Sequence, residues 1–294
     1  MKESSRTRVA KVLGVIFLSS LAGLLVIKIL QQGVYSSKLG MNIVIVGKET
    51  MALLLLRPEE DVVGWVDFPR NLKVKIYNSD AKYPANSLWS YGVLVKNPYE
   101  VVEKTVGLSM GVVVAKTIRI EAETSIEGVL KDLYKIGLKT NLSLKDRLMI
   151  RKFLVETVAS KKLLEMDMPT KIFEVQVEPD GKEFVSFNSV ASLWTKNKFV
   201  LESILSENVD LVVNNLTGQS GLGTQVARQL ESTGMRVIEV KSDQGSEVTA
   251  GNGCFFSVSG KYPFTESLLV QQMNCLEFGK TEQEGEKGIT VWLK

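Results

Sequence analysis

The sequence predicts a mixed α/β protein with an N-terminal transmembrane helix, an α/β domain and a small C-terminal α/β sandwich domain. Three observations lead to this fold class. Residues 12–30 form an apolar run that follows a basic segment. Residues 41–205 alternate short β-branched runs with segments of helical spacing. Residues 209–294 begin with a strand, a glycine-rich loop, a helix and a second strand.

The apolar run is interrupted only by Lys28, which lies close enough to one end to snorkel. At ~1.5 Å per residue, a helix of this length just covers the ~30 Å hydrocarbon core of a bilayer. The preceding basic residues are Lys2, Arg6, Arg8 and Lys11. The positive-inside rule therefore predicts a cytoplasmic N-terminus at residues 1–11, a single span at 12–30, a tether at 31–40 and an extracytoplasmic body.

A cleaved secretory signal is the main alternative for this segment. No small-x-small cleavage site follows Leu30, and the apolar core is longer than is usual for a signal. A buried helix of a globular domain is a further alternative. We expect a retained anchor in the cell membrane.

Composition excludes several kinds of chemistry. The 294 residues include no histidine, which removes histidine-dependent triads and most zinc sites. The formal net charge of +3 is too small to indicate a nucleic-acid partner. The two cysteines, Cys254 and Cys275, are too few for a thiolate metal site. In an exported domain they are expected to pair as a disulfide, with two inert buried thiols as the alternative.

The first body, residues 41–205, is expected to be a layered α/β unit. A Ser143 and Asp146 pair resembles a capping box and starts a helix that we expect to run to about residue 165. Gly107 is expected to end an earlier helix. The expected strands are 42–46, 52–56, 62–68, 72–76, 111–120, 172–177 and 184–187, and the other expected helices are 99–106 and 125–136.

The second body, residues 209–294, follows a boundary near residues 206–208. Its expected strands are 211–214, 236–240, 254–258 and 289–292, and its expected helices are 224–231 and 265–275. The glycines of loop 218–223 indicate a structural turn, because glycine supplies positive φ. Phosphate binding at the following helix is the alternative, although the loop lacks the spacing of a dinucleotide fingerprint and the lysine of a P-loop.

Residues 209–239, which read VDLVVNNLTGQSGLGTQVARQLESTGMRVIE, resemble the C-terminal domain of the LytR type. The resemblance extends to the closing residues 288–291. It implies a domain of extracytoplasmic cell-envelope proteins that has no established catalytic role.

The first body resembles the LytR–CpsA–Psr (LCP) catalytic domain more weakly. MNIVIVG at 41–47 is similar to its opening strand, and residues 53–76 are similar to a hairpin that ends in a Pro-Arg-Asp step. The segments 86–92 and 99–107 are similar to the part of that domain beyond the hairpin. This resemblance implies transfer of polyprenyl-pyrophosphate-linked glycopolymers onto cell wall, with arginines on the pyrophosphate and an aspartate on a divalent ion.

The sequence departs from the LCP pattern at the expected site. Only Lys48-Glu49-Thr50 stands where the family has a longer loop leading to Arg-x-Asp-Thr, and Asn71 replaces the acidic residue after Arg70. The Arg-x-x-Arg-Gln pattern is absent around Arg147. Candidate phosphate-binding residues are therefore Arg70, Lys48, Glu49, Arg119 and Arg147, with no metal ligand set.

The leading hypothesis is a membrane-anchored extracytoplasmic cell-envelope protein that binds a lipid-phosphate or wall polymer without catalysis. An active phosphotransferase using Lys48, Glu49 and Arg70 is one alternative, and Mg²⁺ would be a cofactor only in that case. A structural or partner-binding anchor is another. Convergence of Glu49, Arg70 and Arg119 or Arg147 on a deep apolar groove would favour lipid-phosphate binding. A filled core beneath Arg70 would favour the structural alternative.

Overall fold

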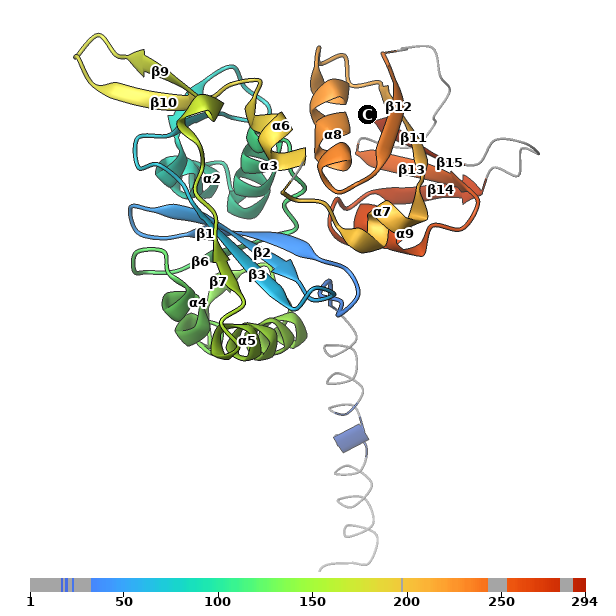
Figure 1. The fold of residues 1–294 in the computed structure, drawn as a ribbon, viewed down its shortest axis with the longest axis horizontal. Coiled ribbons are helices and arrows are strands. Elements are labelled where there is room, and N and C mark those ends of the chain that lie inside the picture. The colour runs from blue at the N-terminus through green and yellow to red at the C-terminus, as the bar shows by residue number, and fades with distance from the viewer. Residues whose placement is uncertain are drawn as a thin grey trace, which may run out of the picture.

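We analysed a computed structural model, which describes residues 17, 19, 20, 23, 33–196, 198–242, 253–280 and 288–294. Two α/β units lie side by side (Figure 1). The expected mixed α/β class is confirmed. The expected span at 12–30 falls almost wholly outside the described residues. Within the part of the chain that is described, no helix is both long enough and apolar enough to cross a membrane.

The first unit is built on a six-stranded sheet with the order β7-β6-β1-β2-β3-β8. Strands β1, β2 and β3 form an antiparallel meander, and β6 pairs with β1 in parallel. Every residue of β1 and β2 is buried, which explains why both read as continuous apolar runs. The strands are β1 Met41–Val46, β2 Met51–Arg57, β3 Val62–Asp67, β6 Lys116–Arg119, β7 Lys139–Thr140 and β8 Leu163–Glu165.

Alternate side chains of β1 leave the sheet in opposite directions, so both faces of the sheet are apolar. Helices cover both of these faces. Val44 and Val46 pack in the core beneath α2 (Leu88–Leu94) and α3 (Pro98–Met110). Ile43 and Ile45 pack in a separate core beneath α4 (Ile126–Asp132) and α5 (Leu144–Ala159). The expected capping box is confirmed at Ser143 and Asp146, at the start of α5.

Smaller elements complete the first unit. The hairpin of β9 and β10 projects at the end of the molecule opposite α4 and α5 (Figure 1). These elements are β4 Lys73–Lys75, β5 Lys82–Pro84, the 3₁₀ turns Ala85–Ser87 and Thr170–Ile172, β9 Phe173–Val177, β10 Glu183–Phe187 and α6 Ala191–Lys196.

The second unit is a five-stranded sheet with the order β12-β11-β15-β13-β14. Its core joins side chains of β11, β13 and β15 to those of α8 and α9. Its elements are α7 Glu202–Glu207, β11 Asp210–Asn215, α8 Leu222–Ser232, β12 Arg236–Lys241, β13 Cys254–Ser259, α9 Pro263–Gln271, β14 Leu276–Lys280 and β15 Gly288–Leu293.

The helix expected at 99–106 is longer than predicted, and the strand expected at 111–120 is shorter. Gly107 lies inside α3, where a Cβ would stand 2.6 Å from the Nε2 atom of Gln229. The helix instead ends at Gly111, whose φ of 69° suits a left-handed C-cap. Val112 and Val113 are buried but do not extend β6, because side-chain amides of Gln229 and Asn42 donate to their carbonyls.

Three other helices end earlier than expected, and a strand follows each of them. Helix α4 stops at Asp132 rather than at residue 136, ahead of β7. Helix α5 stops at Ala159 rather than near 165, and Lys161 takes a φ of 56°. β8 then pairs with β3 in parallel. Helix α9 stops at Gln271, so the end of the expected helix at 265–275 and the residues after it turn into β14. Strands β8 and β14 were not predicted.

The tether is bound to the first turn of α5. The Val34 amide donates to both carboxylate oxygens of Asp146, at 3.0 and 3.2 Å, and the Tyr35 amide donates to Oδ1 at 2.9 Å. The Ser143 hydroxyl donates to Oδ2 at 2.8 Å. The Asp146 side chain is only 1% exposed, so these bonds replace the water that a buried carboxylate requires.

Contacts also join the two units directly. The Gln229 side chain of α8 donates to the Val112 carbonyl at 2.9 Å, and Gln272 donates to the Gly40 carbonyl at 2.9 Å. Leu39 and Val113 of the first unit are buried within the core of the second. The units therefore share buried amide bonds as well as apolar surface.

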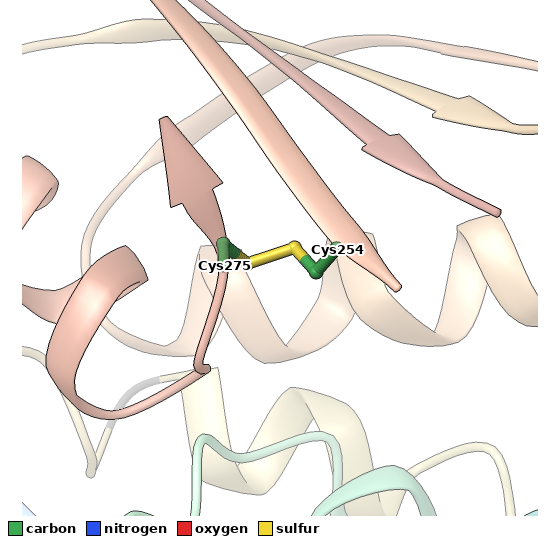
Figure 2. Close-up of a disulfide and its surroundings, with 2 residues drawn as sticks. All are labelled: Cys254 and Cys275. Atoms are coloured by element: carbon green, nitrogen blue, oxygen red, sulfur yellow. A yellow bond between two sulfur atoms is a disulfide. The ribbon is translucent and has the colours of Figure 1, made fainter. Parts of the chain in front are cut away.

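The disulfide between Cys254 and Cys275 is confirmed (Figure 2). It joins the start of β13 to the residue that precedes β14, with a Cα–Cα distance of 4.4 Å. The described residues contain no free cysteine.

We predict that replacing both cysteines by serine lowers the free energy of unfolding of the second unit by about 3 kcal/mol, because the bond restricts the unfolded chain. Urea unfolding of the full chain in detergent, with and without the substitutions, measures this loss. Thiol titration of the unfolded, unreduced chain should detect no free thiol. Two free thiols, or an unchanged transition, would contradict the prediction.

Candidate functional site

Four of the five candidate phosphate-binding residues lie at one end of the first sheet. Parallel strands β1 and β6 both finish there, at Val46 and Arg119. Lys48 and Glu49 follow β1, and Arg70 follows β3. The arrangement gathers residues that are more than 70 positions apart in the sequence. We call this set, together with Glu121 and Glu123, the strand-end cluster.

Two loops at this edge are held together by hydrogen bonds. The Lys48 amide donates to the Ala122 carbonyl at 2.9 Å. The Thr50 hydroxyl accepts from the Thr124 amide at 2.8 Å and lies 3.0 Å from the Thr124 hydroxyl. The backbone that carries Lys48 and Glu49 is thus tied to the backbone that follows β6.

Arg70 lies between two carboxylates. Its guanidinium nitrogens lie 4.0 Å from Glu49 and 3.6 Å from Glu123, and its side chain is 69% exposed. Exposed pairs of this kind contribute at most about 1 kcal/mol to stability. Below the turn, Phe68 and Leu72 are buried in the core of the α2 and α3 face. This is the filled core beneath Arg70 that favours a structural role.

Arg119 is the one cation of the cluster with an unsatisfied buried nitrogen. Its Nη1 is buried and has no hydrogen-bond partner. Its strand partner is Val46, so both side chains leave the sheet on the α2 and α3 face. Burial lowers the pKa of the Arg119 guanidinium, and the nearby Glu121 opposes that shift. An anion would satisfy this nitrogen.

The strand-end cluster has no excess of positive charge. Its cations Lys48, Arg70 and Arg119 are matched by the carboxylates Glu49, Glu121 and Glu123. Among the described residues, no group of three or more acidic, cysteine or histidine side chains could hold a metal ion. A diphosphate needs several uncompensated cations or a metal ion, and this cluster supplies neither.

Arg147 lies elsewhere, in α5 on the opposite face of the sheet. Its Nε and Nη2 atoms donate to the Leu133 carbonyl at 2.9 and 2.6 Å, and Nη2 also donates to the Lys135 carbonyl at 2.6 Å. These carbonyls lie at the C-terminal end of α4, where a cation compensates the helix dipole. The structure does not bring Arg147 to the other candidates.

The glycine-rich loop before α8 has the geometry of a turn. Gly218 and Gly221 have φ angles of 73° and 80°. The side-chain Oδ1 atom of Asn215 accepts from the Thr217 amide and hydroxyl, and its Nδ2 atom donates to the Gln219 carbonyl at 2.8 Å. Side chains of the loop itself therefore satisfy much of its polar backbone.

A second candidate site is the cleft between the two units, with a volume of about 660 Å³. The first unit contributes Tyr77, Tyr99 and Glu103, and the second contributes Gln219 and Asn274. Additional amides come from Asn78, Asn97 and Asn141. Such a combination of amides and aromatic rings suits a polar, uncharged ligand. Cleft residues come from turns and helix ends far apart in sequence, and no sequence pattern marked them.

Glu103 is the most perturbed acid in the cleft. Burial raises its pKa to about 7, against the opposing effect of hydrogen bonds from Asn141 and Thr117. Asn141 donates to its Oε1 atom at 2.8 Å and the Thr117 hydroxyl lies 3.0 Å from the same oxygen. The rings of Tyr77 and Tyr99 stand nearby, and burial raises the pKa of both phenols.

No family model matches the sequence, and no curated protein matches it. Similar solved structures include TagT of B. subtilis, with a TM-score of 0.42, 12% identity, and coverage of 56% of this chain and 91% of that chain. TagV of B. subtilis has a TM-score of 0.39 and 10% identity, and the match covers 52% of this chain and 93% of that chain. The LytR-CPS2A-psr family protein YwtF (TagT) with bound octaprenyl pyrophosphate lipid has a TM-score of 0.38 and 13% identity, and the match covers 53% of this chain and 88% of that chain. These likenesses assign no activity to the chain.

We predict that Glu103→Gln removes a pH-dependent part of the stability. Because burial raises the folded pKa from 4.5 to about 7, the folded state binds this proton more tightly than the unfolded state. The stability that this provides is complete below the unfolded pKa and is lost as pH rises through 7.

Between about pH 4 and pH 8, the free energy of unfolding of the wild type should fall relative to that of Glu103→Gln, by on the order of 3 kcal/mol. Urea unfolding across this range measures the difference. A constant difference would show that Glu103 titrates normally.

Proposed function

We propose that the chain is a membrane-anchored extracytoplasmic cell-envelope protein that binds a wall polymer without transferring it. The observation that carries the non-catalytic part is the charge balance of the strand-end cluster. Phosphoryl transfer depends on cations or metal ions that stabilise charge developing in the transition state. Three carboxylates beside three cations cancel that stabilisation.

The anchor is proposed from the sequence alone. The apolar run at 12–30 and the basic residues before it support a body outside the cell, where cell-wall polymers are found. The resemblance of residues 209–239 to LytR-type C-terminal domains supports the same location. An exported location is also the compartment in which the Cys254–Cys275 disulfide persists.

The cleft between the units is the proposed polymer site. Its amide groups offer both donors and acceptors to hydroxyl-rich chains, and Tyr77 and Tyr99 offer ring faces to sugars. Glu100 and Glu103 are offset there by Lys104 and Lys116, so an uncharged segment meets no strong net field.

A lipid-phosphate ligand is a second candidate, favoured by the buried, unpartnered Nη1 atom of Arg119. A single phosphate could satisfy that nitrogen. The nearby Glu49, Glu121 and Glu123 oppose a doubly charged group, and for this reason the cleft is our first choice.

We predict no polymer transfer by the full chain. Purified protein in detergent, incubated with a polyprenyl-pyrophosphate glycan, peptidoglycan and Mg²⁺, should leave the glycan unattached to the acceptor. Attachment that disappears in Arg70→Ala would contradict the non-catalytic proposal and support the phosphotransferase alternative. Arg228→Ala, at an exposed arginine of α8 in the second unit, is the matched control and should transfer as the wild type does.

We also predict that Tyr77→Ala weakens binding of soluble peptidoglycan glycan strands by about fivefold, since it removes a ring face worth roughly 1 kcal/mol. Titration calorimetry with the full chain in detergent measures the affinity. Tyr134→Ala, at an exposed tyrosine outside the cleft, is the matched control and should bind normally. Equal affinity of wild type and Tyr77→Ala would exclude the cleft, and weakening by both variants would indicate a non-specific effect.

A further inference from the structure

Helix α5 carries an exposed apolar stripe on its outer side. Ile150 and Leu154 point into the core, whereas Leu144, Leu148 and Val155 are 51%, 45% and 42% exposed. With 3.6 residues per turn, these three positions fall within an arc of about 40°. An arc this narrow places the three side chains on one side of the helix, and Arg151, whose guanidinium lies 3.8 Å from the centre of the Tyr134 ring, stands between Leu148 and Val155.

The segment after α4 extends this stripe. Tyr134 and Ile136 are both exposed. Arg147 binds the carbonyls on either side of Tyr134, and the Arg151 Nη1 atom donates to the Tyr134 hydroxyl at 2.9 Å. We call the five residues Leu144, Leu148, Val155, Tyr134 and Ile136 the α5 patch.

Five lysines belong to the same stretch of sequence as the patch, residues 131–155. Lys135 pairs with Asp132 and Lys152 with Glu156. Within the described residues, Lys131, Lys139 and Lys145 have no ion pair, and all three belong to α4, α5 or the strand between them. An apolar centre with a cationic border is typical of a helix that lies on an anionic bilayer.

The tether brings the membrane to this helix. Val34 and Tyr35 are bound to Asp146 in the first turn of α5. Four peptide steps separate residue 34 from the end of the expected span at residue 30, which limits their separation to about 14 Å. Figure 1 shows the tether beside α5, at the end of the molecule that carries α4 and α5.

We propose that the α5 patch docks on the lipid bilayer that holds residues 12–30, with its aliphatic side chains among the headgroups and Lys131, Lys139 and Lys145 near anionic phosphates. This inference rests on the membrane anchor of the proposed function. It adds that the body has one fixed orientation on the membrane, with the β9 and β10 hairpin directed away.

Tryptophan quenching by brominated lipid tests the proposal. The full chain is reconstituted in vesicles of phosphatidylcholine and phosphatidylglycerol with brominated acyl chains. Leu148→Trp should show at least twofold more quenching of its added fluorescence than Val175→Trp, placed on β9 at the opposite end. Wild-type protein, with its four tryptophans, supplies the background. Both positions are exposed, so neither substitution disturbs a core.

Lys145→Glu in the Leu148→Trp background should reduce the quenching, because it reverses a charge at the border of the patch. Quenching of Leu148→Trp no greater than that of Val175→Trp would overturn the docking proposal. If Leu148→Trp is also shielded from aqueous iodide, a protein partner or a second copy covers the patch instead.

Alkaline carbonate extraction separates the two proposals. A chain that stays in the vesicles but shows no added quenching retains its anchor and lacks the docked face. A chain released by carbonate lacks the anchor, and the docking proposal is overturned with it.

Discussion

One buried carboxylate, Asp146, joins residues 34 and 35 to the first turn of α5. Asp146 caps α5 through Ser143 and at the same time accepts the amides of Val34 and Tyr35. A carboxylate in the first turn of a helix is stabilised by the free amides and the dipole there. Removing it would leave two tether amides and the cap without a partner, each costing ~1–3 kcal/mol when buried. The tether, the helix cap and the sheet face beneath α5 are therefore one unit.

Electrostatics separates the two candidate sites. At the strand ends, three carboxylates neutralise three cations, and the surface pairs of Arg70 are solvated. A pyrophosphate gains little at such a site, because carboxylates already neutralise the cations there and those carboxylates repel the pyrophosphate. The cleft is lined by different groups, namely amides, aromatic rings and the buried Glu103, whose pKa burial raises to about 7. This contrast is what supports the proposal of binding without transfer.

Local rules predicted the features with local causes. The buried strands at 42–46 and 52–56 were predicted from apolar runs, the helix cap from the Ser143 and Asp146 pair, and the disulfide from the two cysteines; all are present.

Features set by distant partners were missed. Gly107 reads as a helix end but is required by the approach of Gln229, and β8 forms only because β3 is available to pair with it. The cleft joins Tyr77 to Asn274 and has no local signature. Arg147 reads as a phosphate ligand, although its partners are carbonyls of α4.

The central claim is that Asp146 holds residues 34 and 35 on α5 and thereby keeps the body close to the proposed anchor. Hydrogen exchange of the Val34 and Tyr35 amides, in the full chain reconstituted in vesicles, tests it most directly. The account predicts strong protection of both amides in the wild type and its loss in Asp146→Ala, while amides of β1 and β2 stay protected in both proteins. Exchange of Val34 and Tyr35 in the wild type at the rate of an unstructured peptide would contradict the account.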